Sequence, residues 1–157
     1  MNDKVRDALL WLKDILEKNQ IEYQIVGGFA AFLHGGSREI ADIDLYINKS
    51  DAEKLLPNVV DFISKPLTHY VEGGWDLEYL QLIYRTQKIE IGLTPGTRIQ
   101  STDGVWFELE TDFNTSVART YKGIEVSVIP VDKLLEYKRI LGREVDLIDI
   151  VELEHLK

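Results

Sequence analysis

Hydrophobic and polar positions follow two different periods along the chain, and both of its flanks carry the period of a helix. Between Asp3 and Lys18 apolar residues recur at helical spacing with lysines and glutamates opposite them, which predicts an amphipathic surface helix covering a sheet. The same spacing over 131–157, with a break near Gly142, predicts a helical C-terminal region. Helices therefore flank the central part of the sequence.

The central part contains short runs that are apolar or alternate between apolar and polar residues, and these predict β-strands. Two of the runs flank a short turn at Thr86 and Gln87, which predicts an antiparallel hairpin. A loop is expected over 111–122. The predicted strands cover residues 21–26, 42–47, 67–72, 77–84, 88–93, 105–110 and 124–129.

Two further helices are predicted inside this strand-rich part. The first is a short apolar helix over 29–34. The second begins at Ser50, which has the spacing of a capping box with Glu53, and Pro57 within it predicts a kink or a fresh start. With 157 residues and 45% hydrophobic content, the chain suits one α/β (α+β) domain over 1–157. We expect a mixed, partly antiparallel sheet with helices packed against one face.

Asp42 and Asp44 are the first candidate functional residues. Side chains alternate across a strand, so these two carboxylates project from one face while Ile43 and Leu45 point into the core. Neighbouring carboxylates repel unless a cation lies between them, and hard oxygen ligands suit Mg²⁺ or Mn²⁺. The alternative is a solvated pair of aspartates at the start of a strand.

Glu90 is the expected third carboxylate. Two aspartates do not easily bridge two divalent ions, so a third carboxylate from a neighbouring strand is expected. Isoleucines flank Glu90 in its strand, so its carboxylate projects from the face opposite theirs. The alternative is a solvated charge on an edge strand.

Gly27 and Gly28 are candidate phosphate-binding residues. They permit close approach of the backbone to a ligand, and they precede the predicted helix over 29–34, where free amides favour phosphate. Arg38 follows in a loop, from which its guanidinium can pair with a triphosphate or with Asp42. A loop salt bridge is the alternative for Arg38.

The run from Val26 to Leu45 resembles the signature of the DNA polymerase beta-type nucleotidyltransferase superfamily: an apolar residue, Gly-Gly, an apolar helix, then Asp-Ile-Asp-Leu. Within that superfamily, GGFAAFLHG followed by Arg38 resembles the small prokaryotic branch that includes AbiEii-type nucleotidyltransferase toxins. The resemblance implies a nucleotidyltransferase-like fold, a nucleoside triphosphate substrate, and metal and catalytic roles for Asp42, Asp44 and Glu90.

The C-terminal region also resembles the tail of the AbiEii-type branch, in which a lysine is followed by an Arg-x-x-Asp-x-x-Asp pattern. Here the pattern falls on Lys138, Arg143, Asp146 and Asp149. By analogy, Lys138 approaches the nucleotide phosphates and Asp146 or Asp149 supports it. The alternative is an amphipathic helix with an ordinary charged face.

The composition of the chain limits the classes of ligand and the kinds of site that it can have. The net charge of −9 opposes bulk binding to nucleic acid, whereas a small nucleotide held by metal ions is compatible with it. The absence of cysteine excludes disulfides, thiolate zinc sites and cysteine nucleophiles. No stretch approaches the ~20 apolar residues of a membrane span, and the N-terminus is charged where a signal peptide is apolar. We therefore expect a cytoplasmic protein.

Two functions follow from these observations. The first is metal-dependent transfer of a nucleotide to a hydroxyl acceptor, which is a small molecule, a protein or RNA. The second is a catalytically weak or inactive nucleotide-binding or regulatory protein, serving as one partner of a toxin–antitoxin pair. The second is motivated by the acidic surface, which suits a protein partner or a further copy of the chain, and by the short chain, which leaves little room for an acceptor-binding helical domain.

Overall fold

The computed structural model describes residues 3–156, and its centre is one mixed sheet. The nine strands follow the order β7-β6-β4-β5-β2-β1-β9-β8, with β3 paired to β4 beside this path. The pairs β1–β9 and β2–β5 are parallel and the others are antiparallel, which confirms the predicted fold class. The strands are β1 (Tyr23–Val26), β2 (Ile43–Asn48), β3 (Ile63–Glu72), β4 (Trp75–Tyr84), β5 (Gln87–Thr94), β6 (Arg98–Gln100), β7 (Trp106–Glu108), β8 (Val117–Tyr121) and β9 (Ile124–Val128).

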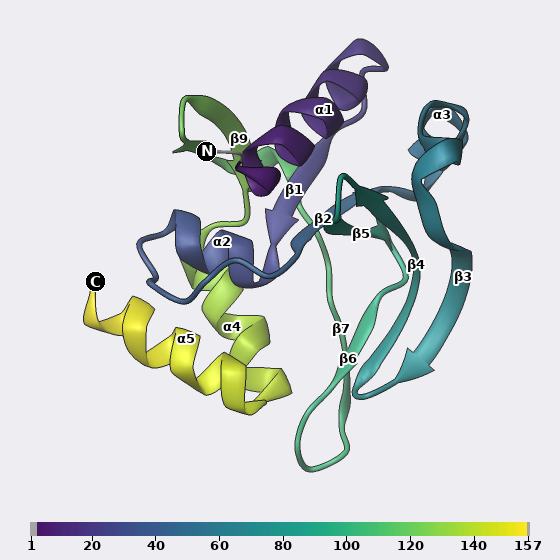
Figure 1. The fold of residues 1–157 in the computed structure, drawn as a ribbon. Helices are drawn as coiled ribbons and strands as arrows, with labels where there is room; N and C mark the ends of the chain where they lie inside the picture. Colours follow the sequence, from purple (N-terminus) through teal and green to yellow (C-terminus); the bar gives the residue numbers. More distant parts are fainter. Residues whose placement is uncertain (1–2, 157) are drawn as a thin grey trace.

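The α-helices of the described residues form two groups around this sheet (Figure 1). The buried leucines of α1 lie over Ile25 and Ile43 of the sheet, and α3 contacts α1. In the second group α4 packs against both α2 and α5. Figure 1 shows this second group on the side of the molecule opposite β3 and β4. The helices are α1 (Lys4–Lys18), α2 (Gly27–Leu33), α3 (Ala52–Val59), α4 (Val131–Leu141) and α5 (Glu144–His155).

The alternation predicted for the central strands is present in the structure. Ile43 and Leu45 of β2 are buried in the hydrophobic core together with Ile89 of β5. Asp44 and Glu90 occupy the intervening positions, so they project from the opposite face. The core thus lies on one side of these strands, and the acidic side chains lie on the other.

Two short strands were not predicted, because neither shows a recognisable alternation of apolar and polar residues. β6 has three residues, too few to show a period. β8 falls in the predicted loop over 111–122, because most of its side chains are exposed and it lies at the edge of the sheet, where no apolar alternation is needed. The turn of the β4–β5 hairpin also lies one residue earlier than predicted, at Arg85 and Thr86, which both have positive φ.

The predicted capping box at Ser50 and Glu53 is wrong. The chain first makes a 3₁₀ turn in which the Asn48 side chain accepts a hydrogen bond from the Ser50 amide, and Asp51 then precedes α3 without a side-chain cap. The predicted fresh start at Pro57 is also wrong, because α3 continues through it to its end at Val59. Pro57 lacks the amide that would donate to the carbonyl of Glu53, so α3 continues without that one backbone hydrogen bond.

Gly92 of β5 makes room for the ring of Tyr46, its register partner on β2. A Cβ atom at position 92 would lie 2.5 Å from Cε1 of Tyr46, far inside van der Waals contact. We therefore expect Gly92→Ala to lower the free energy of unfolding by about 1 to 3 kcal/mol, as overpacking does. Chemical denaturation measures this loss.

A double-variant cycle identifies the cause of that loss. If the clash with Tyr46 is responsible, Gly92→Ala costs less in a Tyr46→Leu background than in the wild-type chain. Equal costs in both backgrounds contradict the explanation.

Candidate functional site

A cleft of about 440 Å³ lies between the acidic face of the sheet and helices α4 and α5. Its walls come from parts of the chain that are distant in sequence: the β1–α2 junction, the start of β2, the middle of β3 to β5, and the α4–α5 region. The lining includes every predicted site residue except Asp146 and Asp149. The lining residues that the following description uses are Gly27, Gly28, Arg38, Asp42, Asp44, Tyr46, Trp75, Glu90, Tyr137, Lys138 and Arg143.

The three predicted carboxylates border this cleft together. Asp44 on β2 is the register partner of Glu90 on β5, and Asp42 immediately precedes β2. Burial, together with the charges of Glu90 and Asp42, raises the pKa of Asp44 to about 7. The chain thus brings together hard oxygen donors whose mutual repulsion a divalent cation would relieve.

The carboxylates do not converge on one point in this conformation. Within residues 3–156, no group of three or more His, Cys, Asp or Glu side chains is arranged so that it could hold a metal ion. The role of Asp42, Asp44 and Glu90 as metal ligands therefore stays a prediction. The donor set fits a divalent cation because it consists of hard carboxylate oxygens and because burial and the charges of Glu90 and Asp42 raise the pKa of Asp44.

The raised pKa of Asp44 predicts a pH dependence of stability. The ordinary pKa is 3.8 and the folded value is about 7, so between these values the folded chain keeps a proton that the unfolded chain releases. Stability should therefore fall as pH rises from about 4 to about 7, by up to about 4 kcal/mol, and then level off. Denaturant titrations across this range, compared with those of Asp44→Asn, isolate the effect. Parallel curves for the two proteins would contradict it.

Gly27 is required where β1 meets α2. Its φ is +69°, and an added Cβ would lie 2.6 Å from Oδ2 of Asp44. Its amide donates a hydrogen bond of 2.7 Å to the Tyr137 hydroxyl, so the expectation of a free amide at Gly27 is wrong. Gly28 lies against Arg38, because a Cβ there would be 2.9 Å from Nη2 of the guanidinium. The two glycines thus allow close contacts with an acid and a base of the cleft.

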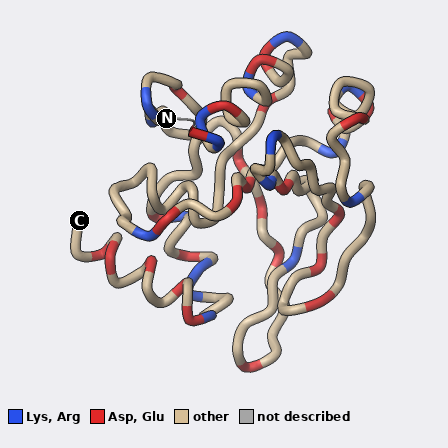
Figure 2. The backbone as a smooth tube through the Cα atoms, viewed as in Figure 1, with Lys and Arg blue, Asp and Glu red and all other residues tan. Residues whose placement is uncertain are grey.

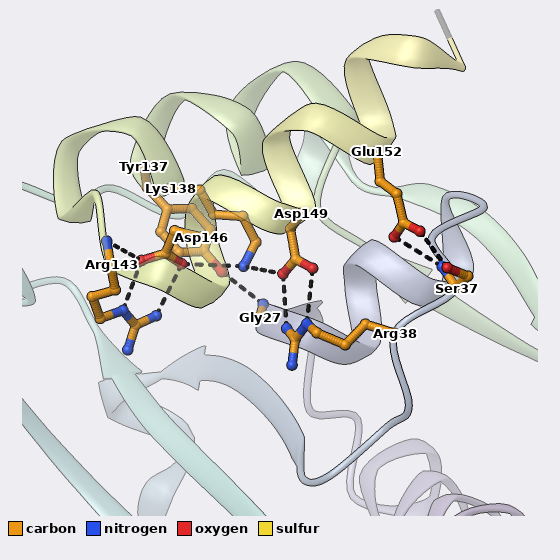
Figure 3. Close-up of polar contacts among 9 residues, drawn as sticks. All are labelled: Gly27, Ser37, Arg38, Tyr137, Lys138, Arg143, Asp146, Asp149 and Glu152. Carbon is orange, nitrogen blue, oxygen red and sulfur yellow. Dashed lines mark hydrogen bonds and ion pairs between the residues drawn. The ribbon is translucent and has the colours of Figure 1, made fainter.

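An ion network, Arg38–Asp149–Lys138–Asp146–Arg143, joins the loop after α2 to α4 and α5 (Figure 3). Arg38 donates to both oxygens of Asp149, at 3.0 and 2.8 Å. Lys138 Nζ lies 2.9 Å from Asp149 and 3.4 Å from Asp146, and Arg143 donates to Asp146 at 2.7 and 3.0 Å. Ser37 and Glu152 form a further link beside the network.

The centre of this network is buried. The side chain of Lys138 is 2% exposed, and those of Asp146 and Asp149 are no more exposed. Burial alone would raise the pKa of Asp149, but hydrogen bonds from Arg38 and Lys138 hold it below its usual value. The alternative of an ordinary solvated helix face is therefore wrong for Asp146 and Asp149. Arg38 pairs with Asp149, and the predicted pairing with Asp42 is absent from the ion pairs of the described residues.

Several residues of the site were not singled out from the sequence. Tyr137 anchors Gly27, Arg143 lies over the ring of Trp75 at 5.9 Å, and Gln81 bonds Glu90. Arg143 was named as part of the C-terminal Arg-x-x-Asp-x-x-Asp pattern, but no role was assigned to it from the sequence. Gln81 was missed because the predicted turn at Thr86 and Gln87 would place Ile83 opposite Glu90, whereas the actual register places Gln81 there. Tyr137 looked like one apolar position of an amphipathic helix.

The charges of the molecule are mixed along its length. Lysine and arginine positions are scattered among the more numerous acidic ones (Figure 2). No helix in the described part of the chain combines the length and the apolar character needed to cross a membrane.

Comparisons with known proteins bear on the fold. No family model and no curated protein matches the sequence. Among solved structures, a Thermotoga maritima protein provisionally assigned as a nucleotidyltransferase has a TM-score of 0.69 and 19% identity, covering 97% of this chain and 95% of its own. The lincosamide antibiotic adenylyltransferase LnuA, with lincomycin bound, has a TM-score of 0.65 and 18% identity. The match covers 99% of this chain and 100% of LnuA.

A third structure, ANT(2'')-Ia in complex with adenylyl-2''-tobramycin, has a TM-score of 0.64 and 11% identity, covering 96% of this chain and 88% of its own. At these identities the likeness concerns the fold. The chain has a nucleotidyltransferase fold, as the resemblance of 26–45 implies.

Proposed function

We propose that this protein transfers a nucleotide from a nucleoside triphosphate to a hydroxyl acceptor with the help of Mg²⁺ or Mn²⁺. One observation carries the proposal: Asp42, Asp44 and Glu90 crowd one wall of the cleft, where burial, together with the charges of Glu90 and Asp42, raises the pKa of Asp44 to about 7. The nucleotidyltransferase fold supports it. Such crowding is unfavourable in a free carboxylate cluster and is relieved by bound cations.

The three acids have two roles in this proposal, metal binding and proton transfer. Asp42, Asp44 and Glu90 would hold the metal ions, which supply charge neutralisation at the reacting phosphate and at the leaving pyrophosphate. Glu90 accepts the proton of the acceptor hydroxyl as the acceptor oxygen bonds to the α-phosphorus. The bond from that phosphorus to the pyrophosphate oxygen breaks, and the pyrophosphate leaves with its negative charge.

The basic side of the cleft is proposed to bind the triphosphate. Arg38 and Lys138 line the cleft, and the glycines at 27 and 28 bring the backbone close to it. Both cations are already paired with Asp149, so Asp149 orients them, and phosphate oxygens would share their remaining donors. Asp146 supports Lys138 from the other side.

A small molecule is the proposed acceptor. LnuA is covered over 100% of its length by this chain, and it is an adenylyltransferase with lincomycin bound, so the fold at this size accommodates a small acceptor without a further helical domain. The net charge of −9 disfavours RNA as the acceptor.

The second candidate is a nucleotide-binding protein with little or no turnover, as a member of the AbiEii-type branch acting with a protein partner in a toxin–antitoxin pair. The resemblance to that branch is supported by the meeting of its two separate motifs, since Arg38 of the first pairs with Asp149 of the second. Weak turnover is favoured by the engagement of the Gly27 amide with Tyr137, which withdraws one donor from an incoming phosphate.

Labelled nucleotides test these two candidates. The protein is incubated with each of the four nucleoside triphosphates, labelled on the α-phosphate, together with Mg²⁺ and a small-molecule extract. Transfer to an acceptor supports the enzyme, and calorimetric binding of nucleotide without any transfer supports the second candidate. If the protein neither binds nor transfers a nucleotide, both candidate functions are contradicted.

A further inference from the structure

Gln81 is a buried polar residue that the proposed chemistry does not use. Its side chain on β4 is 5% exposed and faces Glu90, its register partner on β5. Nε2 of Gln81 donates a hydrogen bond of 3.2 Å to Oε1 of Glu90. Buried amides of this kind are kept by specific hydrogen bonds, because burying them without partners is costly.

Ser64 completes the arrangement from β3. Ile63 pairs with Leu82 and Lys65 with Gln81, so β3 advances by two residues where β4 advances by one. Ser64 is therefore the extra residue of a β-bulge, and bulges re-aim side chains. The Ser64 hydroxyl donates to Oε1 of Gln81 at 2.9 Å.

Glu90 and Ser64 together orient the Gln81 amide: the carboxylate of Glu90 only accepts hydrogen bonds, and the Ser64 hydroxyl lies 2.9 Å from Oε1 and 3.2 Å from the backbone carbonyl oxygen of Gln81. With Oε1 accepting from Ser64, the amide nitrogen points at the carboxylate and donates to it. A flipped amide would place its oxygen against the carboxylate, where two acceptors repel. The bulge in β3 thus places a hydroxyl against the oxygen end of that amide.

The donor to Glu90 is neutral, in contrast to the donors to Asp146 and Asp149. Those two acids are paired with lysine and arginine, whereas none of the ion pairs among residues 3–156 involves Glu90. A neutral amide fixes the direction of a carboxylate and leaves its charge available to a metal ion or a proton.

We propose that Gln81 is a positioning residue for Glu90 and that Ser64 acts through Gln81 by fixing its amide. The inference rests on the proposed function, in which Glu90 binds metal and accepts a proton. It adds a line of hydrogen bonds, Ser64 to Gln81 to Glu90, that runs across three neighbouring strands.

Matched variants test whether the hydrogen bonds from Ser64 to Gln81 and from Gln81 to Glu90 position Glu90. Gln81→Met keeps length without the amide, and Ser64→Val and Ser64→Thr have the same shape but differ in the hydroxyl. The first readout is the affinity for Mn²⁺ in the presence of a non-hydrolysable ATP analogue, measured by electron paramagnetic resonance. The second is the steady-state release of pyrophosphate from ATP with water as the acceptor. We expect Gln81→Met to lose about 10- to 100-fold in kcat or Mn²⁺ affinity with KM for ATP nearly unchanged. Ser64→Val should lose less, and Ser64→Thr should restore the wild-type values.

The outcomes separate the two proposals. Wild-type protein that binds no Mn²⁺ and no ATP analogue overturns the proposed function and this inference with it. Wild-type binding or turnover that Gln81→Met leaves unchanged overturns the inference alone. Equal losses in Ser64→Thr and Ser64→Val overturn the role of the hydroxyl, because they show a structural effect of the substitution.

Discussion

Asp44→Asn should reduce nucleotidyl transfer about a thousandfold, since the stabilisation that a bound metal supplies is worth several kcal/mol and each 1.36 kcal/mol is about tenfold in rate. The substitution removes the charge of the acid that is most strongly perturbed in the cleft with little change of shape. The rate of labelled transfer, measured as in the test of function, gives this loss directly.

Ligand-free Asp44→Asn should melt at or above the wild-type temperature at pH 8, because it removes a buried charge that repels Glu90 and Asp42. Wild-type protein at a hundredfold excess of nucleotide and Mn²⁺ over Kd should gain ~2.7 kcal/mol, a shift of roughly 5 to 10 °C. The variant should lose most of this shift. Asp61→Asn, the same change at an exposed position away from the cleft lining, is the control. An undiminished ligand shift in Asp44→Asn would show that the carboxylates do not form a metal site.

Lys138→Met should cost about 3 kcal/mol of folding stability, the lower end of the range for breaking a buried ion pair. The lysine lies between Asp146 and Asp149, and its removal leaves two buried carboxylates with one cationic partner each, Arg143 and Arg38. Those arginines prevent a larger loss. Calorimetry should show a melting temperature lower by roughly 6 to 12 °C.

Lys133→Met on the same helix is the matched control, because its side chain is 66% exposed and its ion pair with Glu136 is solvated. We expect a change within about 0.5 kcal/mol there. Adding Asp149→Asn to Lys138→Met should recover part of the loss by removing one of the two buried charges that are left with a single cationic partner. Equal melting temperatures for Lys138→Met and Lys133→Met would mean that the buried lysine does not stabilise the fold.

Local patterns predicted the parts of the molecule whose physical cause is local. The amphipathic helix over 3–18 follows from a period that its own residues carry, and Asp3 caps it. The shared face of Asp44 and Glu90 follows from alternation on two strands flanked by isoleucines, and the structure places these acids as register partners. The glycines that begin α2 were singled out because glycine permits close approach of the backbone, and in the structure Gly27 has a φ of +69°.

What the sequence by itself determined is therefore the order and type of most elements and the face of the sheet that Asp44 and Glu90 share. Only the tertiary structure decided the partner of Arg38, because that partner lies far away along the chain. Arg38 could pair with Asp42 or a phosphate by local reasoning, yet it pairs with Asp149, 111 positions away. The burial of Lys138 between two acids depends on how α4 meets α5 and the loop after α2, which no periodicity within one helix encodes.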